Sequence, residues 1–259
     1  MIEFIEPNNI LRKYIKNYCI VEINSSMDFL RAEKVFPNGN ICFVLHYGSP
    51  SKVKKGDSKA YIEPNLVVCG QQTSYYDLAL AGKTGIILIV FKPHGLRAFF
   101  NLPTRELQNE NISLDLLIKS GAGELEDKLL NSKDNKQRIT YIEEFLTRKL
   151  IVNSNFDRID YAIRLIESSK GQIKTHQISQ EVCLGIKQFE RIFSDYVGLN
   201  PKKYSSIIRF QNAIKMKREC KELTMYQLAF DSGYYDQSHF IHDFKSLTGL
   251  TPRDFFNNK

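Results

Sequence analysis

The sequence predicts an α+β protein of two domains: a small antiparallel β sandwich or barrel with trailing helices, followed by an all-α double helix-turn-helix joined by a long helix. Three observations predict this class. Short β-branched and aromatic runs dominate the first ninety residues, helical periodicity takes over after Pro93, and the last hundred residues contain an internal repeat. We expect domains at residues 1–152 and 156–259, separated by the polar break Asn153-Ser154-Asn155.

The first domain is predicted from apolar runs that are bounded by turn residues. Gly, Pro, Asn and Asp cluster between these runs, for example at residues 37–40 and 81–83. Short strands at this spacing are typical of a sandwich or barrel. The five expected strands lie at residues 18–23, 41–46, 66–69, 75–80 and 86–91.

Helices are expected from about residue 94 to the end of this domain, because apolar residues there recur at steps of three or four. The clearest is residues 135–150, with Ile139, Ile142, Leu146 and Leu150 on one face. This apolar stripe either packs on its own domain or meets a partner subunit in a homodimer.

Composition excludes several classes of protein. The longest apolar run, residues 86–91, is far shorter than the roughly 18 to 20 residues that span a bilayer, so we expect no membrane partner. Residues 1–9 carry acids and a proline where a signal peptide would be basic and then apolar, which favours a cytoplasmic location. The five cysteines form no CxxC pair, as expected of reduced thiols.

The internal repeat has an offset of 51 residues. A segment of residues 189–204 recurs at residues 240–255, with five identical positions and two similar ones. The identical pairs begin with Phe189 and Phe240 and end with Pro201 and Pro252. One supersecondary unit is therefore expected twice.

Each repeat has the layout of a helix-turn-helix. A short helix with a small residue, Ser179 or Ala229, is followed by a tight turn and a second helix, and small side chains allow two helices to cross closely. At 100° per residue, one face of each second helix is aromatic and the opposite face is polar. The polar faces carry Lys187, Gln188, Arg191 and Ser194 in the first unit, and Ser238, His242 and Lys245 in the second.

A long helix is expected between the two units, at residues 201–220. Twenty residues span about 30 Å, close to the roughly 34 Å between successive major-groove faces on one side of B-DNA. The segment 170–221 carries 11 basic and 4 acidic residues, a local charge equal to the formal +7 of the whole chain. Lys and Arg side chains here would neutralise phosphates. The candidate phosphate contacts are Lys202, Lys203, Arg209, Lys215 and Arg218.

Residues from about 156 to 257 resemble the DNA-binding region of the AraC family of bacterial transcription regulators. The segment from Ala229 to Pro252, which includes Gly233-Tyr234-Tyr235-Asp236-Gln237-Ser238-His239-Phe240, is similar to the family signature. The resemblance implies a first helix-turn-helix at about 175–197 and a second at about 225–248. It also implies that Lys187, Gln188, Arg191, Gln237, Ser238, His242 and Lys245 face double-stranded promoter DNA.

The sequence departs from the family at three points. The first reading helix begins at Gly185 where a Ser cap is usual, Cys183 lies in the turn, and residues 222–259 are net acidic. The second unit is therefore expected to bind DNA more weakly, or mainly through the backbone. For residues 1–152 the family implies effector sensing or dimerisation, with RNA polymerase as a further partner of an activator.

The remaining candidate sites have ordinary packing as an alternative. His46 and His94 lack ligand-spaced partners, so no metal is expected, and we expect no catalytic residue or cofactor. Phe36, Tyr75 and Tyr76 are candidates for an effector pocket, although strand and turn packing explains them equally well. We expect a non-enzymatic, sequence-specific transcription regulator. The alternative is a β-domain ligand binder or enzyme whose helical half docks a protein partner.

Overall fold

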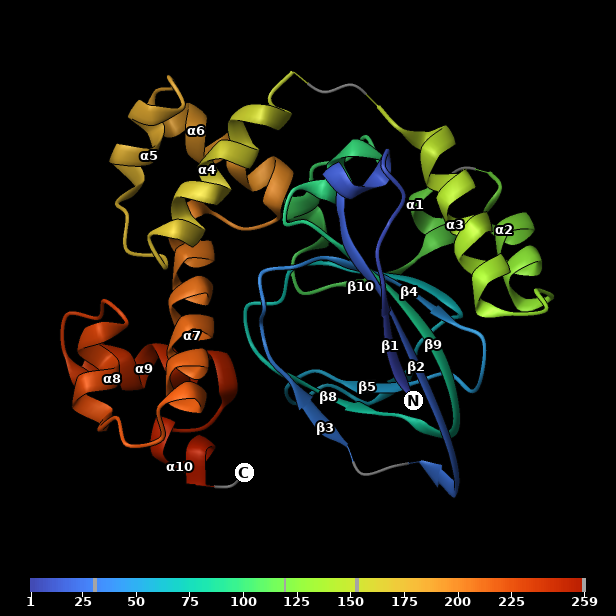
Figure 1. Ribbon diagram of the computed structural model, residues 1–259, viewed down its shortest axis with the longest axis horizontal. Helices are drawn as coiled ribbons and strands as arrows, with labels where there is room; N and C mark the ends of the chain where they lie inside the picture. Colours follow the sequence, from blue (N-terminus) through green and yellow to red (C-terminus); the bar gives the residue numbers. More distant parts are fainter. Residues whose placement is uncertain (30–31, 119, 152–153, 258–259) are drawn as a thin grey trace.

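The computed structural model describes residues 1–29, 32–118, 120–151 and 154–257. The expected end of the first domain at residue 152, the break residue Asn153 and the last two residues lie outside the described ranges. Figure 1 shows a β-rich half beside a helical half that is organised along one long helix, α7.

Two antiparallel sheets form the β-rich half. Their strand orders are β1-β2-β9-β4-β7-β10 and β3-β8-β5-β6. This arrangement confirms the predicted antiparallel β domain. The strands of the larger sheet are β1 (Ile2–Ile5), β2 (Ile15–Phe29), β4 (Cys42–His46), β7 (Leu66–Cys69), β9 (Ala81–Phe91) and β10 (Asn111–Ser113). The smaller sheet contains β3 (Glu33–Val35), β5 (Lys52–Lys54), β6 (Tyr61–Ile62) and β8 (Tyr76–Ala79).

The turn predicted at residues 81–83 is wrong, because these residues begin β9. Lys83 pairs with Asn24 and Thr84 with Ile23 on β2. Ladder hydrogen bonds to a long neighbouring strand therefore outweigh the local turn preference of glycine.

Short helices follow the sheets. The 3-10 turns are η1 (Leu11–Lys13), η2 (Gly95–Ala98) and η3 (Thr104–Leu107), and the α-helices are α1 (Leu114–Leu117), α2 (Ala122–Leu130) and α3 (Asn135–Lys149). The α3 stripe of Ile139, Ile142 and Leu146 is buried within the chain, so the first of its two interpretations describes the structure.

The helical half confirms the predicted double helix-turn-helix. Helix α7 (Pro201–Glu219) separates the pair α5 (Thr175–Glu181) and α6 (Ile186–Val197) from the pair α8 (Met225–Asp231) and α9 (Gln237–Thr248). Helices α4 (Phe156–Ser168) and α10 (Pro252–Asn257) complete it. Asn200 caps α7, since its side chain accepts a hydrogen bond from the Lys203 amide at 2.8 Å.

The two halves share one hydrophobic core, which runs from the sheets through α4 and α6 to α9 and α10. Phe36 packs edge-on against Phe255, with ring centroids 5.2 Å apart. Gln211 donates a hydrogen bond of 2.5 Å to the Pro37 carbonyl. In the described part of the chain, every helix is too short or too polar to cross a membrane.

Candidate DNA-binding surface

The repeat produces the same aromatic packing in both helix-turn-helix units. Phe189 and Phe193 of α6 have ring centroids 5.5 Å apart, and Phe240 and Phe244 of α9 are also 5.5 Å apart. The second ring of each pair then packs on the aromatic residue of the following helix. These pairs are Phe193–Tyr204 at 5.7 Å and Phe244–Phe255 at 5.2 Å. Repeated sequence positions therefore perform repeated structural roles, with one face of each second helix committed to the core.

The turns of the two units differ in length, since residues 182–185 join α5 to α6 and residues 232–236 join α8 to α9, but each has a left-handed residue at its second position. Gly233 has φ of 77°, which glycine adopts without steric cost, whereas Cys183 at the corresponding position has φ of 54°. The second helices both end at glycines in the left-handed conformation, Gly198 with φ of 87° and Gly249 with φ of 73°. The left-handed residue of the turn is thus kept in both units, at some backbone strain in the first.

The outward face of α6 carries the residues that the sequence assigned to DNA. Lys187, Gln188 and Arg191 are exposed. Ser194 is half-buried, and its hydroxyl donates to the Glu190 carbonyl at 2.7 Å. Three cationic or amide side chains are therefore available to an external ligand, while Ser194 lies at the margin of this face.

The neighbouring residue Asp195 points to the β-rich half. Its carboxylate pairs with Arg105, and its carbonyl accepts a hydrogen bond of 3.1 Å from the Thr104 hydroxyl. The C-terminal end of α6 is therefore held by η3, while its N-terminal half remains open.

The outward face of α9 is also open. Gln237, Ser238, His242 and Lys245 are exposed. Asp243 on the same helix turns inward and accepts hydrogen bonds from the Ser206 and Tyr234 hydroxyls, at 2.8 and 3.2 Å. Inward placement of this carboxylate removes one negative charge from the face that the resemblance assigns to DNA.

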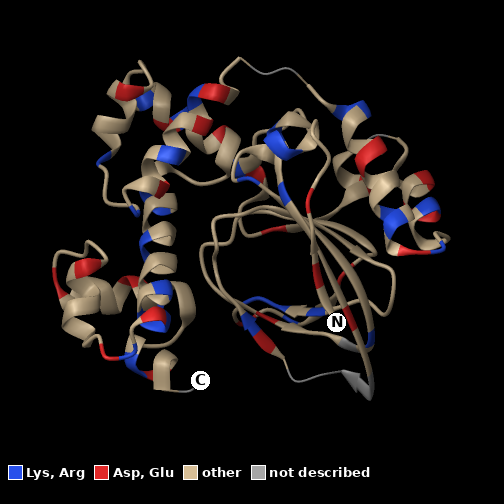
Figure 2. Ribbon diagram, viewed as in Figure 1, with Lys and Arg blue, Asp and Glu red and all other residues tan. Residues whose placement is uncertain are grey.

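Helix α7 sets the separation between the units. Its 19 residues span about 28 Å at 1.5 Å per residue. Figure 2 shows Lys and Arg at several places along this helix. Lys202, Lys215 and Arg218 are exposed, and Lys203 is half-buried. These four remain candidates for phosphate contacts.

Arg209, the fifth phosphate candidate, turns into the protein instead. Its guanidinium donates to the Gly171 carbonyl at 2.9 Å and lies over the Tyr234 ring, 5.3 Å from the centroid. A side chain that satisfies a buried carbonyl and covers an aromatic ring has a structural role, which helical periodicity alone does not reveal.

The three effector-pocket candidates separate in the structure. Phe36 and Tyr76 line a cavity of about 340 Å³ between the two sheets. Tyr75 does not line it; its ring lies against Gly249 of the helical half and under the Lys34 ammonium, 3.6 Å from the centroid. Neighbouring residues of an extended chain point to opposite faces, so Tyr75 and Tyr76 cannot both face the cavity.

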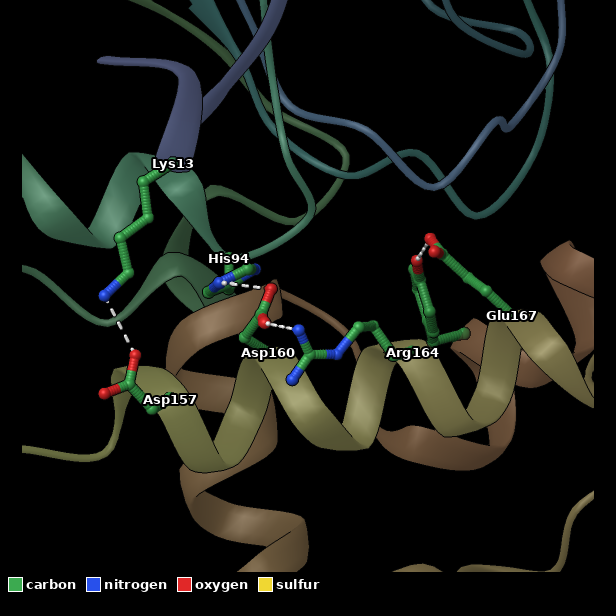
Figure 3. Close-up of polar contacts among 7 residues, drawn as sticks. Lys13, His94, Asp157, Asp160, Arg164 and Glu167 are labelled. Atoms are coloured by element: carbon green, nitrogen blue, oxygen red, sulfur yellow. Dashed lines mark hydrogen bonds and ion pairs between the residues drawn. The ribbon is translucent and has the colours of Figure 1, made fainter. Parts of the chain in front are cut away.

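Sequence reasoning missed the polar contacts that join α4 to the β-rich half (Figure 3). Lys13 bonds Asp157 at 2.9 Å, and His94 Nε2 lies 3.5 Å from an Asp160 oxygen. Asp160 also pairs with Arg164 at 3.0 Å. His94 is buried beside Phe156, and no group of three or more potential metal ligands occurs among the described residues. Single charges far apart in sequence gave no signal for this contact.

Comparison with known proteins assigns the two halves to separate families. Residues 178–258 match the family described as a helix-turn-helix domain, and residues 3–113 match a domain of unknown function, DUF6597. The chain is 27% identical over 109 residues to the HTH-type transcriptional regulator ArgR of Pseudomonas aeruginosa, covering 42% of this chain and 33% of that protein. An uncharacterized HTH-type transcriptional regulator of Haemophilus influenzae is 22% identical over 93 residues, covering 36% and 31%.

The chain therefore spans about a third of the length of the curated relatives that it matches. Among solved structures, ToxT from Vibrio cholerae aligns over 93% of this chain and 97% of its own, with 13% identity and a TM-score of 0.47. The AraC-like transcriptional activator CuxR aligns over 78% and 74%, with 14% identity and a TM-score of 0.28.

Two exposed faces, carried on repeated units at the ends of one helix, define a tandem helix-turn-helix protein. Residues 178–258 match the helix-turn-helix family model, in agreement with the helix pairs α5–α6 and α8–α9. Both curated relatives are named as transcriptional regulators.

Proposed function

We propose that the protein is a sequence-specific DNA-binding transcription regulator and acts as an activator. The observation that carries this proposal is the equivalent exposure of the polar faces of α6 and α9 at the two ends of α7. Each face would enter one of two successive major grooves, since α7 spans about 28 Å. RNA polymerase would then be the protein partner at the promoter.

In this proposal the two faces contribute unequally. Lys187, Gln188 and Arg191 on α6 combine positive charge with an amide that can pair with adenine, which suits direct readout of bases. The α9 face has Lys245 as its cation beside polar Gln237, Ser238 and His242, and residues 222–259 are net acidic. The first unit would supply most of the affinity, and Lys202, Lys203, Lys215 and Arg218 would contact phosphates.

We assign residues 1–152 to effector sensing or dimerisation and residues 156–259 to DNA binding. The cavity between the sheets supports a small-molecule effector. The stripe on α3 is covered by the chain itself, so a homodimer would need another surface.

The test is a binding titration with DNA sites selected from genomic fragments, for the protein and for a Lys187→Ala, Arg191→Ala variant. The variant should lose its preference for the selected site over a mismatched one, by about 10- to 100-fold for each base that it no longer reads. A Lys128→Ala, Lys149→Ala variant removes the same charge from α2 and α3 and should keep that preference. Unchanged selectivity in the first variant would refute the assignment.

A further inference from the structure

The space between the two sheets is larger than one cavity. A second cavity of about 120 Å³ adjoins the first, and the two share the lining residues Val44, Cys69, Tyr76, Leu78 and Leu88. Together they form an elongated space with a wide end near Phe36 and a narrow end at residues of β4 and the following loops. The wide part alone falls in the range of about 300 to 1,000 Å³ that is typical of small-molecule sites.

The walls of this space are apolar. Leu78 and Val44 from facing sheets line both parts, and Cys42 and Cys69 lie opposite each other on β4 and β7. Burial raises the pKa of Cys42 to about 12 and raises that of Cys69 well above its usual value. Both thiols are therefore protonated at neutral pH and behave as small apolar groups. Most of a bound molecule would have to be apolar.

The narrow end is lined by buried polar side chains whose hydrogen-bonding capacity is not completely used. His46 and Glu63, which are 1% and 6% exposed, form a pair with Nε2 3.2 Å from the carboxylate. Asn111 donates to the other Glu63 oxygen at 2.6 Å. Within the described ranges, neither His46 Nδ1 nor the hydroxyl of the 1% exposed Ser51 has a hydrogen-bond partner. Buried polar atoms are rarely left unsatisfied, so these two atoms point to a missing partner.

We propose that this space binds an elongated apolar molecule with an uncharged, hydrogen-bond-donating head group, such as a hydroxyl, at Ser51 and His46. A His46 ring that donates from Nε2 to Glu63 leaves Nδ1 as an acceptor, and the Ser51 hydroxyl both donates and accepts. A carboxylate head would be buried beside the Glu63 carboxylate. Neither a Lys nor an Arg is among the lining residues of the described chain, and the nearby Lys55 ammonium is bonded to the Asn111 side chain and the Asn109 carbonyl, so an anionic head would have no counter-charge in contact with it.

A molecule in the wide end would touch residues that also contact the helical half of the protein. Phe36 and Pro37 line the cavity, and the same two residues contact Phe255 and Gln211. A molecule that displaces the 36–37 segment would therefore alter the contact with α7 and α10. This link to DNA binding rests on the proposed function, whereas the head-group selectivity does not.

The experiment is a calorimetric titration of the full chain with decanol and with decanoic acid, which share the chain length and differ in the head group. The protein should bind decanol at least about tenfold more tightly than the acid at pH 7. Ser51→Ala should weaken decanol binding about five- to tenfold without lowering the melting temperature, because its hydroxyl bonds nothing in the free protein. If Ser51 instead stabilised the fold, Ser51→Ala would lower the melting temperature and leave decanol binding unchanged.

Glu63→Gln supplies the second variant. Removal of the carboxylate charge should narrow the difference between the affinities for decanol and decanoic acid, because the repulsion is lost while the cost of burying an unpaired carboxylate remains. Equal binding of acid and alcohol by the unaltered protein, or binding of neither, overturns the proposal. Undiminished decanol binding by Ser51→Ala also overturns it.

Gel-shift assays without either molecule keep the two hypotheses apart. DNA binding without decanol binding refutes the ligand site alone. Selective decanol binding by a protein that ignores DNA refutes the proposed function alone.

Discussion

His94 lies buried in the contact between the β-rich half and α4, and it makes that contact sensitive to acid. It is 1% exposed and packs on Phe156 with ring centroids 4.2 Å apart. Burial is the main cause that lowers the pKa of His94 from 6.5 to about 3, and the nearby cations Lys92, Lys13 and Arg164 act in the same direction. The carboxylate of Asp157 opposes the shift. The ring is therefore neutral in the folded protein at any ordinary pH.

The sign and size of the effect follow from this shift. Between about pH 6.5 and 3 the unfolded chain binds a proton at this position that the folded chain does not, so stability falls as the pH decreases. One pH unit corresponds to about 1.4 kcal/mol. Between pH 7 and pH 5 the free energy of unfolding should fall by about 2 kcal/mol through His94 alone.

The assay is urea unfolding at pH 7 and pH 5 of the protein and of a His94→Phe variant, which keeps an aromatic ring against Phe156. The protein should lose about 2 kcal/mol more than the variant over this interval, since contributions of all other groups cancel in the comparison. His176→Phe, at an exposed position on α5, is the matched control and should keep the full loss. Equal losses for the protein and the His94 variant would show that this ring is not buried as described.

Two further predictions concern the helical half. Gly185→Ser places a capping hydroxyl at the start of α6, where φ is −64° and the space around the added carbon is open. The substitution should raise the free energy of unfolding by about 0.5–1 kcal/mol in thermal or urea unfolding. A loss of stability would contradict the described helix start. Arg209→Ala should lower that free energy by about 2 kcal/mol, because the Gly171 carbonyl is deprived of a charged donor. Arg218→Ala, at an exposed site, should leave stability unchanged and reduce the slope of log K against log salt for DNA binding by about 1; the reverse pattern would refute both assignments.

The helical half was predictable because its signals are local. The apolar period and the Pro at the first turn of α7 lie within single elements, and the 51-residue repeat can be read by aligning the sequence with itself. The aromatic face of α6 is buried and its polar face is exposed, as 100° steps from Phe189 predict. The local positive charge that assigned the basic residues of α7 to phosphates does not show which of them turn inward, and for this reason Arg209 was placed with the phosphate contacts.

The β-rich half was predicted in class but not in detail. Strands such as β5, which is three residues long and has lysines at both ends, present too little apolar pattern to be found in the sequence. The contacts between the halves were missed for a different reason. Phe36 and Phe255 are far apart in the chain, and nothing near either residue shows which surface it meets. The site residues Ser51 and Glu63 likewise become neighbours only when the strands pair.

The C-terminal glycines of α6 and α9 have a consequence for the proposed DNA binding. Each ends its helix and also lies against the β-rich half, Gly198 beside Gln71 and Gly249 beside Tyr75. Two features thus set the distance between the two units: the length of α7, and the separation of the two places on the β-rich half that Gly198 and Gly249 contact. Insertion of one helical turn into α7 would separate one of these two glycines from the residue of the β-rich half that it contacts. If the protein binds DNA as proposed, the operator spacing that it accepts will depend on its β-rich half as well as on α6 and α9.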